Sequence, residues 1–273
     1  YEIIGEAGNG REALEKIMAT ALAGGHVLLE DFPGLGKTLI ARSFARTLGL
    51  EFRRIQFTPD LLPADITGGY VYNRASGQFE LRQGPVFTQI LLADEINRAS
   101  PKTQSALLEA MQENHVSLEG ETLPLPAPFM VLATQNPIEY EGTFPLPEAQ
   151  LDRFLVRLTL GYPSLEEEQA ILQQRRQRQQ EEVVLNPVLA VGQLLEMRAA
   201  VETVYIHPDL EHYIVAVVAE TRRDRHVAVG ASPRASLALM KLARAQAALA
   251  GRDFVVPDDI KMYFHPVLAH RLL

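Results

Sequence analysis

The sequence predicts an α/β protein, with a parallel β-sheet flanked by helices and a smaller, almost wholly helical domain after it. Up to about residue 160, short apolar strands alternate with amphipathic helices, which is the pattern of a parallel sheet with crossover helices. A glycine-rich turn joins the first of these strands to its helix. After residues 161–164 (GYPS) the remaining segments are helical. A chain of 273 residues is long enough for one large α/β unit and a smaller one.

The expected strands are short and mostly apolar. The first, at 26–30 (HVLLE), has the continuous apolar character of a buried strand. Four further strands are expected at 51–57, 90–93, 129–133 and 154–160.

The helices between these strands are marked by apolar faces and by capping residues. A helix over 37–48 carries Ile40 and Phe44 on one face, and Gly49 ends it as a C-cap. Another helix begins at 100–101 (SP), which supplies an N-cap serine and a first-turn proline. The apolar residues of that helix are Leu107, Leu108 and Met111.

The final part of the chain is expected to be a small helical domain. Its helices are predicted at 165–180, 194–201, 210–221, 233–250 and after Pro257. The first residue is Tyr1 rather than Met, and residues 271–273 end the chain without a capping signal. We therefore expect the natural protein to continue at its ends and the helical domain to be truncated.

Composition and charge exclude some classes of protein. The chain has no cysteine, which rules out disulfides and thiolate metal sites. No apolar run reaches roughly 18 residues, so no membrane span is expected. The first residues lack the layout of a secretory signal, and we expect a cytoplasmic location. A net charge of −8 argues against a nucleic-acid-binding face, although a local basic pore could lie within an acidic total.

Residues 31–38 (DFPGLGKT) lie between the first strand and its helix, the context that a Walker A loop requires. Its glycines let backbone N–H groups form a nest for phosphate oxygens, and the helix N-terminus adds the positive end of its dipole. Lys37 would reach the β and γ phosphates, and the Thr38 hydroxyl would ligate Mg²⁺. We expect ATP to contact the consecutive residues Pro33, Gly34, Leu35, Gly36, Lys37, Thr38 and Leu39.

The loop departs from the usual pattern at its first position, where Asp31 replaces a glycine. A side chain is tolerated there if φ is negative and the side chain points away from phosphate. We expect a slightly altered affinity rather than a loss of binding.

The strand at 90–93 ends in two carboxylates, Asp94 and Glu95. In an open α/β sheet ligands gather at the carboxyl ends of the strands. Asp94 would hold the magnesium shell, and Glu95 would orient and deprotonate the attacking water. Alone, such a strand is a weak signal; downstream of a Walker A loop it is a strong one.

Three further polar residues are candidates for the same site. Asn136 follows the strand at 129–133 and could bind both the γ-phosphate and the attacking water; the alternative is a simple Asn-Pro turn. Arg153, at a helix-to-strand junction, and Arg234, in the first turn of a capped helix, could neutralise charge on the transferred phosphoryl group. For either arginine alone, the alternative is a surface ion pair.

Taken together, the sequence resembles the AAA+ ATPases, and specifically the MoxR group. The matching stretches follow one another in order along nearly the whole chain: 3–5 (IIG), 24–30 (GGHVLLE), 33–38 (PGLGKT), 94–99 (DEINRA), 133–137 (ATQNP), 151–154 (LDRF) and 230–234 (GASPR). The resemblance implies a five-stranded P-loop core at 1–161, with a β-hairpin insertion near 68–84. A linker and helical lid would occupy 162–273. It also implies assembly into a ring, usually a hexamer.

The resemblance also assigns roles to single residues. Asn136 would be sensor 1 and Arg234 the lid's sensor 2, while Arg153 would be the arginine finger that reaches the neighbouring subunit's ATP. Ile3 and Ile4 would line the adenine pocket. Glu6 stands where relatives often have glutamine, and this difference would affect only the contacts to the adenine base. Arg98, just beyond the acids, could face the subunit interface or form a local salt bridge.

Two segments alternate polar and apolar residues around turns, as β-hairpins do. One covers 70–81 and the other covers 115–125. The resemblance places the first hairpin in the central pore, where Tyr72, Arg74 and Phe79 could grip a client protein. Equally, these side chains could pack the hairpin on its own body.

Three functions remain open. The favoured one is an ATP-driven, chaperone-like remodeller of a protein partner, which in this family often carries a von Willebrand factor A domain. The second is a nucleic-acid motor of the helicase type, against which the acidic charge counts. The third is a scaffold that binds ATP and hydrolyses it negligibly. Because Glu95, Asn136 and Arg153 are all present, nothing that hydrolysis requires is visibly lost.

Overall fold

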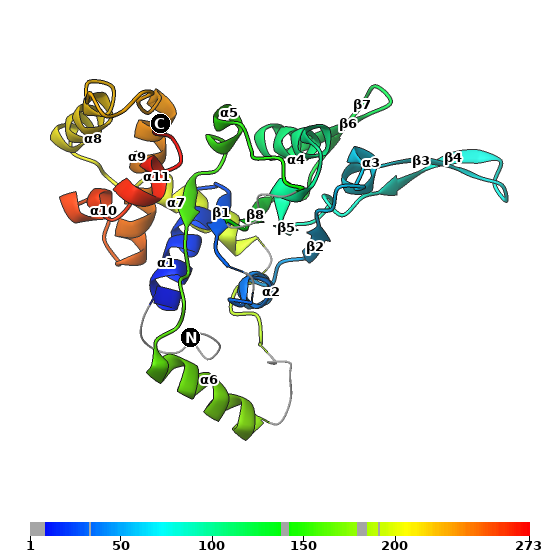
Figure 1. Cartoon of the computed structure of the whole chain (residues 1–273), viewed down its shortest axis with the longest axis horizontal. Helices are drawn as coiled ribbons and strands as arrows, with labels where there is room; N and C mark the ends of the chain where they lie inside the picture. Colours follow the sequence, from blue (N-terminus) through cyan, green and yellow to red (C-terminus); the bar gives the residue numbers. More distant parts are fainter. Residues whose placement is uncertain (1–8, 33, 138–141, 179–184, 191) are drawn as a thin grey trace. The chain divides into compact units, whose positions relative to one another are not determined.

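A computed structural model describes residues 9–32, 34–137, 142–178, 185–190 and 192–273 (Figure 1). The main sheet is made of β1 (Val27–Glu30), β2 (Phe52–Gln56), β5 (Ile90–Asp94), β8 (Met130–Gln135) and β9 (Val156–Leu158). Its strand order is β2-β5-β8-β1-β9, with β2, β5 and β8 running parallel in register. The predicted five-stranded parallel sheet is therefore confirmed; β9 is shorter than expected.

Helices surround the sheet and fill the last part of the chain. They are α1 (Asn9–Leu22), α2 (Lys37–Thr47), α3 (Pro63–Thr67), α4 (Pro101–Glu113), α5 (Glu148–Leu151), α6 (Leu165–Arg178), α7 (Gln193–Glu202), α8 (Pro208–Glu220), α9 (Pro233–Leu249), α10 (Pro257–Lys261) and α11 (Phe264–Leu268), with a 3-10 turn at Ile96–Arg98. The predicted helical character of this last part is confirmed.

The middle of the sheet is apolar on both faces. All residues of β5 are buried, as are the first five of β8. Continuous burial of this kind is typical of central parallel strands covered on both sides. Helix α2 packs on β2 and β5 through an apolar face that includes Ile40 and Phe44. The polar ends of β5 and β8 are therefore fixed by a rigid apolar core.

Two helix starts follow the capping chemistry that the sequence predicts. Ser100 accepts a hydrogen bond from the Thr103 amide at the start of α4, and Ser232 accepts one from the Arg234 amide at the start of α9. Each serine is followed by a proline at the first helical position, where no N–H is needed.

The structure adds elements that the sequence analysis did not predict. Helix α1 buries Ala13, Ile17 and Ala21, whose four-residue spacing was the available signal. The helix expected after Pro257 is two short helices, α10 and α11. Pro266 lies in the first turn of α11, where its missing N–H is tolerated. Inside one continuous helix, this proline would remove a backbone hydrogen bond to the carbonyl four residues earlier.

The chain forms two compact units. One contains Tyr1–Leu28, Phe154–Val184 and Ala190–Leu273, and we call it the helical unit. The other contains Leu29–Arg153 and Leu185–Leu189, and we call it the sheet unit. The division falls within β1, between Leu28 and Leu29.

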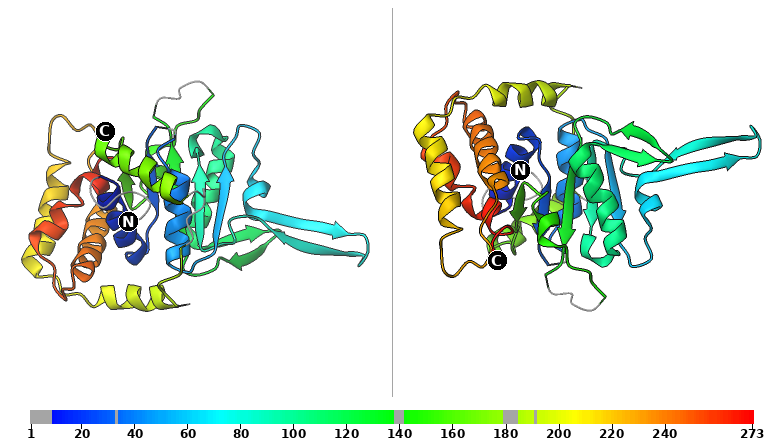
Figure 2. Two further views of the ribbon diagram at one scale, coloured as in Figure 1. Left: turned by 90° about the horizontal axis from the view of Figure 1, so that it is seen from below. Right: turned by 90° about the horizontal axis from the view of Figure 1, so that it is seen from above.

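Two β-hairpins extend from the sheet unit. Strands β3 (Gly68–Asn73) and β4 (Gln78–Gln83) are antiparallel, as are β6 (His115–Leu118) and β7 (Glu121–Pro124). Figure 2 shows them side by side, and the Tyr70 hydroxyl of β3 donates a 2.5 Å hydrogen bond to Glu121 of β7. Both segments that the alternation of residues marked as hairpins are therefore hairpins.

Among the described residues, no helix combines the length and the apolar character needed to cross a lipid bilayer.

The helical unit contains a buried neutral histidine. His270 is 5% exposed, and its Nε2 lies 3.0 Å from the Phe154 carbonyl oxygen. Because a carbonyl only accepts, Nε2 carries the proton. The other ring nitrogen, Nδ1, is buried and has no hydrogen-bond partner among the described residues. Burial, followed by the charges of Arg271 and Arg157, lowers the pKa of His270 to about 3, although the bond to Phe154 acts in the opposite direction.

We expect this histidine to make the helical unit acid-sensitive. The unfolded chain takes up a proton near the ordinary pKa of 6.5, whereas the folded chain resists protonation until about pH 3. As pH falls through this window, the free energy of unfolding should fall by about 1.4 kcal/mol per pH unit from this residue. Above pH 6.5 both states are neutral there, and the effect vanishes.

Urea unfolding between pH 7.5 and 4.5 measures the effect. The control is His270→Gln, which keeps an N–H donor for Phe154 and removes the titration. The wild type should lose stability more steeply than His270→Gln; parallel curves would contradict the assignment.

Candidate functional site

The loop after β1 has the backbone that a phosphate-binding turn needs. Gly34 and Gly36 have φ angles of +87° and +75°, a region that L side chains rarely adopt. An added Cβ at either position would meet nothing within 4 Å, so backbone conformation rather than space requires these glycines. Gly36 is the N-cap residue of α2 and, as a glycine, offers no side chain to cap this helix. The first-turn N–H groups of α2 are thus suited to bind an external anion.

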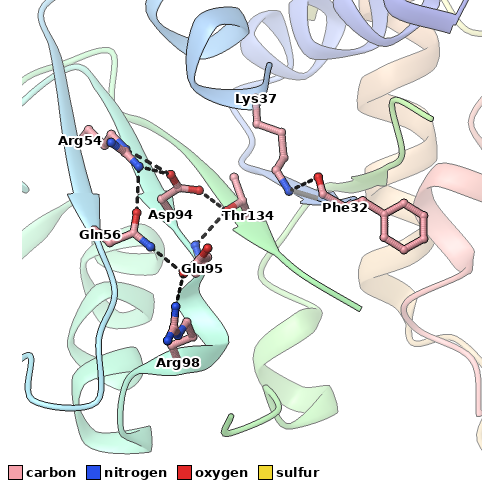
Figure 3. A network of polar contacts seen from close by, with 8 residues as sticks. All are labelled: Phe32, Lys37, Arg54, Gln56, Asp94, Glu95, Arg98 and Thr134. Atoms are coloured by element: carbon pink, nitrogen blue, oxygen red, sulfur yellow. Dashed lines mark hydrogen bonds and ion pairs between the residues drawn. The ribbon is translucent and has the colours of Figure 1, made fainter. Parts of the chain in front are cut away.

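Lys37 folds back over this loop. Its Nζ donates to the carbonyl oxygens of Asp31 (2.7 Å) and Phe32 (3.2 Å), the second of which is drawn in Figure 3. Burial lowers the pKa of the Lys37 ammonium, while the carboxylates of Asp31, Asp94 and Glu95 act in the opposite direction. The ammonium therefore lies close enough to Asp94 and Glu95 for their charges to act on it.

Asp31 occupies the place of the first loop glycine. It is buried, and its amide donates to the Gln135 carbonyl (3.2 Å) at the end of β8. Among the described non-glycine residues, positive φ angles occur at Glu95, Asn114 and Glu119, so Asp31 has the negative φ that a side chain requires. The backbone here tolerates the substitution.

Asp94 is the last residue of β5, and its two carboxylate oxygens have different partners. Oδ1 accepts from the Thr134 hydroxyl (2.5 Å). Oδ2 accepts from Arg54 Nε (3.1 Å) and Nη2 (2.6 Å), on β2. Only 8% of Asp94 is exposed, and in Figure 3 the carboxylate lies between these two residues.

Glu95 follows directly and has a left-handed backbone, with φ 55° and ψ 50°. Its amide donates to the Thr134 hydroxyl (2.8 Å), so one threonine orders both acids. Its Oε2 accepts from Gln56 Nε2 (2.7 Å) and Arg98 Nη1 (2.9 Å). A non-glycine residue held in this region indicates local strain, which often occurs at functional sites. Arg98, for which an interface role and a local salt bridge were both open, forms the salt bridge.

The partners of the two acids form one continuous network, shown in Figure 3. Arg54 Nη2 also donates to Gln56 Oε1 (2.8 Å), which joins the partner of Asp94 to the partner of Glu95. Arg54 and Gln56 are two residues apart on β2 and so share one face of the strand. Arg54 and Gln56 were not predicted from the sequence, and Thr134 was noted only as part of residues 133–137; the available signal was the pair of polar residues at alternate positions, 54 and 56, at the end of β2.

Asn136 follows β8, next to β5 in the sheet, and is buried. Because parallel strands end at the same edge, Asn136 lies at the edge that carries Asp94 and Glu95. The predicted residues that the sheet unit brings to this edge are Lys37, Asp94, Glu95 and Asn136. Thr38 is half-buried and Leu39 is exposed in the first turn of α2, and Leu35 is half-buried in the loop.

The two arginines belong to different parts of the chain. Arg153 follows α5, and its amide donates to the Gln150 carbonyl (3.2 Å). Its side chain is half-buried, and no hydrogen bond joins it to the acids or to Lys37 among the described residues. Arg234 is exposed at the start of α9 in the helical unit. Ile3, Ile4 and Pro33, also predicted at the site, lie outside the described residues.

Comparison with known proteins agrees with this geometry. Residues 26–156 match the family model described as "ATPase family associated with various cellular activities (AAA)", and residues 219–273 match that of the AAA lid domain. A crystal structure from Cytophaga hutchinsonii, described as that of a candidate ATPase, is 41% identical with a TM-score of 0.90; the match covers 100% of this chain and 84% of that one.

Curated relatives match along almost the whole chain. Chaperone MoxR1 of Mycobacterium tuberculosis is 47% identical, over 96% of this chain and 71% of the relative. The uncharacterised protein YeaC of Bacillus subtilis is 52% identical, over 94% and 80% respectively. Protein MoxR of Methylorubrum extorquens is 32% identical, over 98% and 85%. With these relatives, this fold and this loop, the chain is an ATPase and belongs to the MoxR family of AAA+ proteins.

Proposed function

We propose that this ATPase works with Mg²⁺ as an oligomeric ring, a hexamer, and uses ATP to remodel or activate a protein partner in the cytoplasm. The observation that carries the proposal is the meeting of Lys37, Asp94 and Glu95 at one sheet edge, with Thr134 ordering both acids. We also propose a nucleotide-binding core at 1–161 and a linker with a lid at 162–273, which the two matched family models support.

The residues of the loop fit a triphosphate. Uncapped N–H groups, two glycines in the left-handed region and a lysine held by carbonyls all favour an anion here. The residues proposed to contact the phosphates of ATP are Pro33, Gly34, Leu35, Gly36, Lys37, Thr38 and Leu39. Ile3 and Ile4 are proposed to line the pocket of its adenine base. Lys37 would exchange its bonds to Asp31 and Phe32 for phosphate oxygens.

The available ligands also fit Mg²⁺. Thr38 offers a hydroxyl and Asp94 a carboxylate, the oxygen ligands that this cation prefers. When bound, the metal supplies positive charge that neutralises the phosphates. Within the protein, Arg54 already supplies positive charge to Asp94 Oδ2. Arg54 and Mg²⁺ should therefore compete for this carboxylate.

This competition gives a testable expectation for Arg54→Met. The arginine side chain of the Arg54–Asp94 pair is half exposed, and pairs of this kind contribute about 0.2–1 kcal/mol. The measurement is the Mg²⁺ concentration at which binding of a fluorescent ATP analogue is half-saturated. Removing the pair should lower this concentration by up to about fivefold. The control is Arg53→Met, since Arg53 pairs with Glu51 instead (3.0 Å). An unchanged or higher Mg²⁺ requirement in Arg54→Met would rule out the competition.

The remaining residues are assigned by their chemistry. Glu95 would accept the proton of the attacking water, and Asn136 would orient that water and the γ-phosphate. Arg234 would contact the ATP of its own subunit, and Arg153 would contact the ATP of the neighbouring subunit. Gln56 and Arg98 hold Glu95 by one carboxylate oxygen, Oε2.

The β3–β4 hairpin is proposed to contact the partner protein. Tyr72 and Phe79 face each other across the hairpin, with ring centroids 5.4 Å apart, and are 53% and 69% exposed. They pack on one another and remain exposed, which supports contact with a client more than packing on the protein's own body. The name of Chaperone MoxR1 supports the same reading. A von Willebrand factor A domain protein is the proposed class of partner.

A capture experiment tests the proposal. Glu95→Gln should hold ATP and retain its partner, whereas Lys37→Ala should bind little ATP and retain none. Partner retained equally by both variants would contradict ATP-dependent remodelling. If the retained material is instead nucleic acid, with affinity falling steeply as salt rises, the helicase-type alternative is correct. Equal turnover of the wild type and Glu95→Gln would favour the ATP-responsive scaffold.

A further inference from the structure

The two residues that follow Arg153 are held by the C-terminal end of the chain. Phe154 is fully buried, and its carbonyl oxygen accepts from His270 Nε2 (3.0 Å) and from Arg271 Nη2 (2.7 Å). The Leu155 carbonyl accepts from Arg271 Nη1 (3.3 Å). All four residues belong to the helical unit, and the peptide bond before Phe154 joins it to Arg153, which is the last residue of Leu29–Arg153 in the sheet unit.

The same two residues are also held from the start of β1. The Leu155 amide donates to the His26 carbonyl (2.9 Å). The Leu155 side chain lies so close to Gly25 that a Cβ there would come within 2.5 Å of it. A larger residue at position 25 would force Leu155 to move. The backbone at 154–155 is thus fixed on both sides by bonds and by contact.

Arg271 is suited to this task by its shape. Its guanidinium also donates to the Val267 carbonyl in α11, so one planar group binds the oxygens of Val267, Phe154 and Leu155. A guanidinium offers five N–H donors in a fixed fork, whereas a lysine ammonium is a point charge without that geometry. Hydrogen bonds from a charged donor are also stronger than neutral ones.

We propose that Arg271, assisted by His270, is a positioning residue for Arg153. By fixing the Phe154 and Leu155 backbone, it sets where the Arg153 side chain begins. A displacement of about 1 Å in a group that acts on the reacting atoms can cost about 10² in rate. The inference rests on the proposed role of Arg153 toward the neighbouring subunit's ATP. Arg271 binds the backbone oxygens of Phe154 and Leu155 and acts through Arg153.

Subunit mixing tests this inference. Arg271→Met keeps an unbranched apolar stem and removes the guanidinium donors; alone, it should lower ATP turnover by about 10–10² while ATP affinity is unchanged. An Arg271→Met subunit retains its own Glu95, and a Glu95→Gln subunit retains a correctly placed Arg153. Mixing the two should therefore restore turnover at the interfaces where they meet. The same restoration is expected for Arg153→Ala.

The matched control is Arg198→Met. Arg198 also lies in the helical unit and donates to a backbone carbonyl, that of Ala21 (2.7 Å), but it does not bind 154–155. Its loss should lower thermal stability without a turnover defect that mixing repairs. If Arg271→Met does not fold, Arg271→Lys, which retains a single charged donor group without the planar fork, takes its place and should show a smaller, equally repairable defect.

The outcomes separate this inference from the proposed function. If mixing restores Arg153→Ala and not the Arg271 variant, Arg271 does not act through Arg153 and the inference is wrong, while the function stands. If mixing fails to restore Arg153→Ala, the role of Arg153 is wrong and the inference falls with it. Full turnover in Arg271→Met alone would also overturn the inference.

Discussion

Arg153→Ala is expected to reduce ATP turnover by about 10³ or more and to leave ATP affinity nearly unchanged. A fixed guanidinium near the transferred phosphoryl group neutralises charge that develops during the reaction, so its removal affects the rate rather than ground-state binding. Arg153 suits this role because its side chain has no hydrogen-bond partner among the acids or Lys37, and the residues after it are firmly held. Single-turnover hydrolysis and analogue binding measure the two quantities separately.

The control for Arg153→Ala is Arg157→Ala, four residues further along the same segment. Arg157 donates to the Ala269 carbonyl (3.3 Å) within the helical unit. A loss of turnover confined to Arg153→Ala, and repaired by mixing with Glu95→Gln subunits, would support action across a subunit interface. A large loss of ATP affinity in Arg153→Ala would mean that the arginine serves its own subunit's binding site.

Glu95→Gln is expected to lower turnover by about 10²–10⁴ and to preserve or strengthen ATP binding. The amide has nearly the shape of the carboxylate but cannot accept a proton from water. Its oxygen can still accept from Gln56 and Arg98, so the local structure should persist. Loss of one negative charge beside the phosphates should, if anything, favour the nucleotide.

The control for Glu95→Gln is Glu113→Gln, at the end of α4 and away from the sheet edge. Turnover close to that of the wild type in Glu95→Gln would exclude Glu95 as the base. Weakened ATP binding in this variant would instead indicate that Glu95 orders the site in the ground state.

The parts of the fold that the sequence predicted are those set by local pattern. Strands β5 and β8 are continuous apolar runs that end in polar residues, and α4 and α9 begin with serine followed by proline. The alternation of polar and apolar residues around turns predicted both hairpins. In each case the signal lies within a few residues of the element it predicts.

The missed contacts depend on which elements become neighbours in space. Arg54 contacts Asp94 because β2 lies beside β5 in the sheet. The order of these two strands along the chain does not require them to be neighbours. His270 and Arg271 meet Phe154 from the far end of the chain, and no local pattern reports such a pairing. Helix α1 was missed because its buried face is built largely from alanines, which give a weak apolar signal.

The most direct test is the structure of Glu95→Gln crystallised with ATP and Mg²⁺. We expect the phosphates to lie against the amides of residues 34–38, with Lys37 Nζ moved from the carbonyls of Asp31 and Phe32 onto a phosphate oxygen and with Asp94 facing the metal. A triphosphate bound elsewhere, or Lys37 still bonded to those carbonyls beside an empty loop, would contradict it.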